Sequence, residues 1–189
     1  MITFKRFYFV LFFCFSSVLG LAQSTNSANK EAKELLNKAG QSFLKLDSKK
    51  SLDFAQRALI LATKNNDDLL ASKAYNLIGL NLEKFTDYKK AIEYYNKGLV
   101  LVNKVDNDTV KGWLNNNLGN VYCYRKIEFQ KGIKHYKEGL KYSIKHNDEY
   151  EIMFSKLNIG SAYFAVEDFS NGIQYFNDVK DYVDKNGDI

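Results

Sequence analysis

A glycine that recurs at a nearly constant interval is the feature that most restricts how this chain can fold. The four glycines, spaced 39, 40 and 41 residues apart, are Gly40, Gly79, Gly119 and Gly160. An aromatic residue or a leucine follows each of them three positions later. A fixed period of this length is typical of repeat architectures, in which each repeat is one small supersecondary unit.

Two further landmarks keep the same period. An acidic residue precedes a small residue by four positions in the pairs Asp47 and Ser51, Asp87 and Ala91, Glu128 and Gly132, and Asp168 and Gly172. Each unit then ends in an asparagine or a glycine that is followed directly by aspartate. These residues are Asn66, Asn107, Asn147 and Gly187. Because three landmarks share one period, we predict a repeat domain over 30–186, after a short linker at 23–29. Its units are expected at about 30–66, 67–107, 108–147 and 148–186.

Each unit is predicted to contain two helices. In the second unit, Tyr75, Ile78 and Leu82 follow the spacing of one helix face, and Ala91 and Tyr95 lie on the inner face of the next helix. The acidic landmark stands where the second helix would begin, as an N-cap, and glutamate is a poorer cap than aspartate. The chain has no proline, which suits uninterrupted helices. We therefore predict an all-α fold, a right-handed α-solenoid of four stacked helix pairs whose first helices line the concave side.

The pattern resembles the tetratricopeptide repeat. The matching positions are Tyr75, Ile78, Gly79, Leu82, Ala91, Tyr95 and Gly98, then Leu118, Gly119, Tyr122, Gly132, Tyr136 and Gly139, then Ile159, Gly160, Tyr163, Gly172 and Phe176. The period is near 40 residues instead of 34, and the family's proline is missing. HEAT repeats share the period but do not explain these blocks. The resemblance implies a protein-binding or peptide-binding module of the long-helix type found in bacterial sensory and regulatory proteins, before a histidine kinase or a helix-turn-helix regulator.

Residues 1–22 have the pattern of a secretory signal peptide. Lys5 and Arg6 precede an apolar run over 7–21, and small residues stand at Gly20 and Ala22. The run is short for a membrane-spanning helix, although an uncleaved anchor is the alternative. Cys14 does not fit a lipoprotein signal, because the apolar run continues beyond it. We therefore expect an exported protein, in the periplasm or on the outer face of the inner membrane of a bacterium.

Composition disfavours several functions. The net charge is +5, and it falls to +3 once Lys5 and Arg6 leave with the signal peptide, without the dense basic stripe that nucleic-acid binding predicts. Two cysteines and two histidines do not supply a zinc site, and no phosphate loop, HExxH or GxSxG motif occurs. We expect no catalysis, no metal and no cofactor, and a protein or peptide as the partner. A membrane contact would come only from an uncleaved signal or a missing downstream segment. An exported enzyme or lipid carrier is the less supported alternative.

Groove-facing positions are expected on the first helices, six and three residues before each glycine and one and four after it. The resemblance places a peptide there, and we expect it to contact Asn37, Gln41, Lys73, Asn76, Trp113, Asn116, Asn120, Phe154 and Phe164. Asn37, Asn76 and Asn116 occupy one offset in three units, and such an amide ladder can pair with a peptide backbone. The alternative is that these amides bond neighbouring helices. For Trp113, Phe154 and Phe164 the alternative to an apolar patch is the core between repeats.

The last unit has no capping helix after it in this sequence. Ile173, Phe176 and Val179 are therefore expected to lack a neighbour on one side. Either the chain is a fragment of a longer array, or that end associates with itself or a partner. A free-standing periplasmic scaffold that self-associates through the last repeat is our alternative function.

Overall fold

The computed structural model describes residues 27–124 and 128–187, and within them every regular element is a helix. The first helical segment covers 27–44. The others are α2 (Ser48–Lys64), α3 (Asp68–Lys84), α4 (Tyr88–Val105), α5 (Asp108–Tyr124), α6 (Phe129–His146), α7 (Glu149–Ala165) and α8 (Phe169–Asn186). The predicted signal peptide at 1–22 lies outside the described residues. No helix among those described combines the length and apolarity that a bilayer crossing requires.

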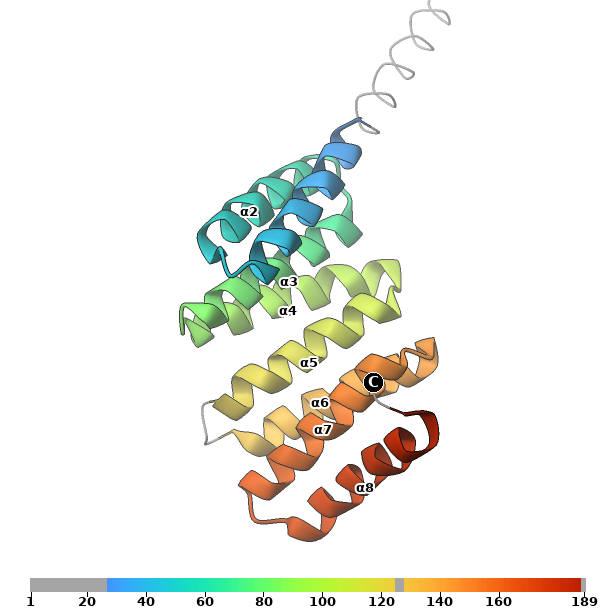
Figure 1. The fold of residues 1–189 in the computed structure, drawn as a ribbon. Coiled ribbons are helices and arrows are strands. Elements are labelled where there is room, and N and C mark those ends of the chain that lie inside the picture. The colour runs from blue at the N-terminus through green and yellow to red at the C-terminus, as the bar shows by residue number, and fades with distance from the viewer. Residues whose placement is uncertain (1–26, 125–127, 188–189) are drawn as a thin grey trace, which may run out of the picture.

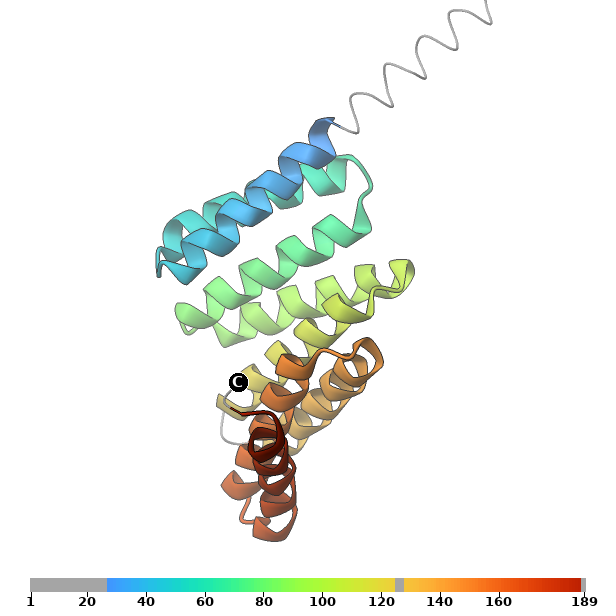
Figure 2. The same cartoon turned by 45° about the vertical axis from the view of Figure 1, so that its right-hand side comes forward.

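The helices stack in pairs along one direction, from the first segment to α8 (Figure 1). Each helix from α2 onward contacts the next one along the chain, and α5 also contacts α3 and α7. Among the described residues the second helices of successive pairs, α4, α6 and α8, do not contact one another. The first helices α3, α5 and α7 therefore lie closer to one another than the second helices α4, α6 and α8 do, along the stack that Figure 2 shows from another side. The predicted all-α solenoid of four stacked helix pairs is confirmed.

Aspartates begin most of the helices. The carboxylate of Asp47 accepts a hydrogen bond from the backbone N–H of Lys50 at 3.1 Å, and Asp87 and Asp168 cap α4 and α8 in the same way. Glu128, at the start of α6, makes no such bond. A side-chain cap contributes about 1 kcal/mol, so α6 has the weakest start of these helices.

The repeated glycine has a direct packing reason. A Cβ atom added to Gly79 would come within 2.4 Å of the Tyr95 ring, and one added to Gly119 would come within 2.4 Å of Tyr136. In these two units the aromatic ring of the second helix thus lies on the glycine of the first helix, and Phe176 lies on Gly160 in the fourth, whereas a Cβ at Gly40 in the first unit would meet nothing within 4 Å. Tyr95 is completely buried in its contact. The glycine and the aromatic landmark are two halves of one contact.

The last pair is better covered than its sequence indicated. Val179 is only 8% exposed, and Phe176 is half-buried against Gly160 and Phe164. Of the three residues expected to lack a neighbour, only Ile173 is substantially exposed, at 50%. The expectation was wrong for these two residues, because Phe176 turns toward Gly160 and Phe164 of α7 and Val179 is buried.

Candidate functional site

The predicted ladder of amides is not available on a groove surface. Asn116 is 2% exposed; its amide nitrogen donates to Glu151 Oε2 at 3.0 Å, and its oxygen accepts from the Ser155 hydroxyl at 3.0 Å. Asn76 is 8% exposed, and its oxygen accepts from the Asn117 amide at 2.8 Å. These contacts match the alternative role, in which the amides bond neighbouring helices. Only Asn37 is exposed.

The other predicted polar positions are scattered. Gln41 is exposed on the first helical segment, and Lys73 is half-buried on α3. Asn120 is half-buried on α5, where its side-chain oxygen accepts from the Tyr136 hydroxyl at 2.7 Å. Asn117, beside Gly119, braces the neighbouring first helix through Asn76, whereas the Asn158 amide nitrogen is buried without a hydrogen-bond partner among the described residues. The structure therefore does not gather these side chains into one polar site.

The predicted aromatic positions lie closer together, on α5 and α7. Phe154 and Phe164 are each 38% exposed, and Leu157 between them is 40% exposed. Tyr150, one turn before Phe154, is 64% exposed, and the two rings stack with centroids 6.4 Å apart. With the exposed Ser161, these residues recur at intervals of three and four and share one helix face. We name the set Tyr150, Phe154, Leu157, Ser161 and Phe164 the α7 stripe.

The remaining faces of α7 are engaged. Toward α5, Glu151 and Ser155 bond Asn116. Toward α8, Lys156 pairs with Asp178 at 2.8 Å, and Tyr163 stacks on Tyr175. Toward α6, Ile159 is fully buried against Ile133 and Tyr136. The α7 stripe is thus the face that points away from α6, on the side where the first helices approach one another.

A pocket lies beside this face. It is a shallow hollow, partly open to solvent, with room for roughly one water molecule, and it forms where the last turns of α6 meet the first turns of α5 and α7. Its lining residues are Asp108, Thr109, Gly112, Trp113, Tyr142, Ser143, His146, Asp148 and Glu151. Trp113 is half-buried and packs against the core around Leu114 and Leu118. It therefore both contributes to the core between repeats and lines the pocket.

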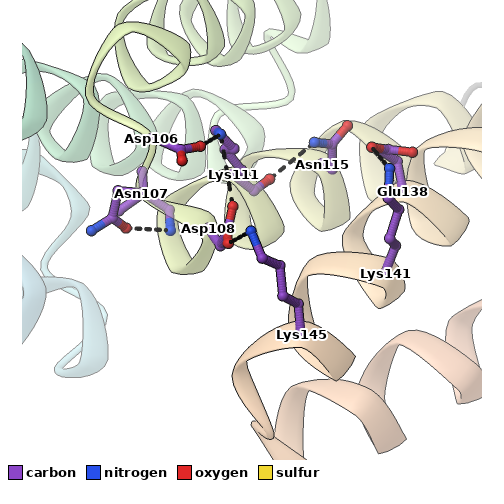
Figure 3. Close-up of polar contacts among 9 residues, drawn as sticks. Asp106, Asn107, Asp108, Lys111, Asn115, Glu138, Lys141 and Lys145 are labelled. Carbon is purple, nitrogen blue, oxygen red and sulfur yellow. Dashed lines mark hydrogen bonds and ion pairs between the residues drawn. The ribbon is translucent and has the colours of Figure 1, made fainter.

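The charges at one wall of the pocket are compensated. Figure 3 shows the ammonium groups of Lys111 and Lys145 directed at the Asp108 carboxylate, at 3.7 and 2.6 Å. Lys111 also pairs with Asp106 at the end of α4. The hydrogen bond from Lys145 is the largest of the effects that lower the pKa of Asp108. This network joins the ends of α4 and α6 to the start of α5.

The opposite wall carries carboxylates of a different kind. Burial raises the pKa of Glu151, the hydrogen bond from Asn116 opposes that shift, and the nearby charge of Asp148 adds to it. Asp148 itself caps α7, accepting from the Glu151 backbone N–H at 3.1 Å. Among the ion pairs of the described residues, neither carboxylate takes part.

Other ionisable groups are built into the helix interfaces. His135 contacts Asn115 Oδ1 at 3.0 Å and stacks on Tyr122, and burial lowers its pKa. Burial raises the pKa of the half-buried Cys123 thiol. Burial also raises the pKa of Glu83 to about 7, although its carboxylate accepts a hydrogen bond from the Tyr95 hydroxyl. In the parts of the chain that the structure describes, no group of three or more His, Cys, Asp or Glu could hold a metal ion.

Comparison with known proteins places the fold. No family model and no curated protein sequence matches the chain. Among solved structures, the apo form of RapI superposes with a TM-score of 0.75 at 16% identity, covering 82% of this chain and 57% of RapI. Aspartyl phosphate phosphatase F from Bacillus subtilis superposes with a TM-score of 0.77 at 14% identity, and the match covers 85% of this chain and 42% of that protein. A Rap protein in complex with competence and sporulation factor gives 0.75 at 14% identity, covering 82% and 43%.

This chain spans about half the length of these solved proteins. At these identities the likeness establishes the fold alone. The chain therefore has the architecture of a tetratricopeptide-like solenoid, and the resemblance seen in its sequence is confirmed at that level.

Proposed function

We propose that this chain is a non-catalytic repeat module that binds a peptide or a peptide-like segment of another protein along its first helices. The observation that carries the proposal is the α7 stripe, where four large apolar side chains on one helix face remain 38 to 64% exposed. Apolar groups gathered on one exposed face are typical of interaction sites. That the fold is shared with a Rap protein solved together with competence and sporulation factor supports a peptide as the class of ligand.

The absence of catalysis is part of the proposal. Glu83 and Glu151, two of the ionisable groups with raised pKa values, each accept a hydrogen bond from a side chain of a neighbouring helix. His135 contacts an asparagine, not a nucleophile. These contacts support roles in helix packing. One solved neighbour is called a phosphatase, which describes that protein.

The cellular context is also proposed. The basic start and short apolar run within residues 1–22 support export, so that the module would act in the periplasm or on the outer face of the inner membrane. There it would serve as the sensory or scaffold part of a signalling protein of the histidine kinase or helix-turn-helix regulator type. Self-association through the last repeat is the alternative that we retain, with Phe169 and Ile173 as the exposed apolar residues of α8.

Selection of peptides from a random displayed library tests the binding proposal. The full chain is the bait. Phage that also bind the double variant Phe154→Ser with Leu157→Ser do not need the α7 stripe and are discarded in a counter-selection. We expect enriched sequences that bind the wild-type chain and lose binding to the double variant. Enrichment that is equal on both proteins, or no enrichment, would contradict the assignment of the stripe as a peptide site.

A further inference from the structure

The pocket and the α7 stripe adjoin each other. Glu151, on the pocket wall, precedes Phe154 of the stripe by three residues, so their side chains are neighbours on the helix surface. Trp113, also on the pocket wall, stands six residues before Gly119, and Phe154 stands six residues before Gly160. The two aromatic residues thus occupy equivalent positions on adjacent first helices, and α5 contacts α7. A ligand lying on the first half of the stripe would extend over the pocket.

The charge of the pocket is one-sided. Asp108 is matched by Lys145 and Lys111. Within the described residues, the hydrogen bonds to Asp148 and Glu151 come from neutral donors, a backbone N–H and the Asn116 amide, and His146 also lines the pocket. Two carboxylates close enough to repel each other, one of them half-buried, favour a positive charge placed between them and the solvent.

The aromatic walls indicate which kind of cation fits. Trp113 and Tyr142 both line the pocket. Lysine and arginine side chains are attracted to the faces of such rings, and arginine also stacks on them while its planar group bonds carboxylates. Because the ammonium groups of Lys111 and Lys141 already lie 5.6 and 5.7 Å from the centre of the Tyr142 ring, the Trp113 ring and the two carboxylates are the groups that complement a further basic side chain.

We infer that the peptide bound by this module carries a lysine or arginine whose charged group lies across the opening of the pocket, next to apolar side chains that cover the α7 stripe. The inference rests on the proposed function and names the chemistry of its ligand. The stripe runs for roughly 20 Å at the rise of an α-helix. An extended peptide of about six to seven residues covers that length. The ligand is thus a short segment with one basic end and an apolar remainder.

A matched pair of probe peptides tests this inference. Each is a seven-residue peptide with blocked ends and leucine at alternate positions; one begins with arginine and its twin with citrulline, which has nearly the same shape without the charge. Trp113 is the only tryptophan of the chain, so its fluorescence reports occupation of the pocket directly. We expect the arginine peptide to change the emission of the full chain at concentrations at least tenfold lower than its twin.

Two protein variants separate the pocket from the stripe. Glu151→Gln keeps the shape of the side chain and should weaken the arginine peptide about tenfold while leaving the citrulline peptide unchanged. Glu167→Gln makes the same change at an exposed position beyond the other end of α7 and should alter neither. Far-UV circular dichroism and the urea midpoint show that each variant is folded.

The possible failures are distinguishable. If both peptides bind equally and Phe154→Ser weakens both, the inference is wrong and the proposed function stands. If neither peptide binds up to millimolar concentration, the inference is wrong, and the library selection still decides the function. If the chain forms a stable dimer that Phe154→Ser dissociates, the stripe belongs to a second copy of this chain, and both proposals are overturned.

Discussion

The ring of Tyr95 occupies the space that a side chain at Gly79 would need, with 2.4 Å between its Cε1 and the position of an added Cβ. The contact joins the first and second helices of one repeat, and Gly119 with Tyr136 repeats it in the next unit. Because the tyrosine is fully buried in the core of α4 and α5, the ring cannot move aside freely. From the second unit onward, the period of the sequence is therefore the period of this contact.

The first prediction concerns Gly79 and the Tyr95 ring that packs on it. Gly79→Ala should lower the free energy of unfolding by about 1 to 3 kcal/mol, because overpacking forces the buried ring or a helix to shift. Gly40→Ala is the matched control: a Cβ there meets nothing within 4 Å, so alanine should stabilise its helix by up to about 1 kcal/mol. Urea unfolding followed by circular dichroism measures both, and equal effects of the two substitutions would refute the packing argument.

The second prediction concerns the buried amide of α5. Asn116→Ala should cost about 1 to 3 kcal/mol of stability, because Glu151 and Ser155 would each lose their hydrogen-bond partner. Asn37→Ala removes the equivalent but exposed amide and should change stability by less than about 0.5 kcal/mol. Thermal unfolding of the two variants checks the difference. If Asn116→Ala leaves the stability unchanged but weakens peptide binding, the binding role predicted for the amide ladder would be correct.

The third prediction concerns pH. Burial raises the pKa of Glu83 to about 7, above its ordinary value of 4.5, so the folded chain binds this proton more tightly than the unfolded chain does. The stabilising contribution is complete below pH 4.5 and is lost as the pH rises through 7. We therefore compare the free energy of unfolding of Glu83→Gln with that of wild type at each pH. The gain of the variant over wild type should be up to about 3 kcal/mol larger at pH 8 than at pH 4.5.

Denaturant unfolding at the two pH values measures that difference. The control is Glu93→Gln, at an exposed glutamate of α4 whose pKa is lowered by the hydrogen bond from Lys97 and not raised by burial. It should leave the pH dependence nearly unchanged. If Glu83→Gln also leaves it unchanged, the carboxyl of Glu83 is not desolvated as described.

The fourth prediction concerns the start of α6. Glu128→Asp should stabilise the chain by about 0.5 to 1 kcal/mol, because the shorter carboxylate can reach the free backbone N–H groups of the first turn. The reciprocal change, Asp168→Glu at the start of α8, should destabilise by a similar amount, since Asp168 now accepts from the Asn171 N–H. Urea midpoints measured side by side test the exchange, and shifts of the same sign in both variants would exclude the capping explanation.

The helices were predictable because each carries its own signals. Asp47, Asp87 and Asp168 stand at helix starts, and in the second, third and fourth units the repeated glycine and the aromatic ring that packs on it recur in register with them. Such signals act within one unit, so a single sequence contains them in full. Glu128 is likewise recognisable from the sequence as the weaker cap.

The candidate site was less predictable because it depends on contacts between units. Counting from the repeated glycine places Asn116 at a position that is expected to face the groove. In the structure, Ser155 and Glu151 of the neighbouring helix α7 bond its amide and bury it. Tyr150 was missed, although its spacing of four from Phe154 is visible in the sequence. The pocket beside Trp113 depends on how three helix ends meet, which no local pattern encodes.

The most direct test of the account is the affinity of one selected peptide for three versions of the full chain. The first version is wild type, and the second is the stripe variant, Phe154→Ser with Leu157→Ser. The third, which we call the outer variant, is Ile60→Ser with Val100→Ser on the second helices α2 and α4, where these residues are 66 and 62% exposed. Titration calorimetry should show at least a tenfold loss for the stripe variant and unchanged affinity for the outer variant. Unchanged binding to the stripe variant, or equal losses for both, would contradict the claim that the exposed face of α7 is where this solenoid holds its partner.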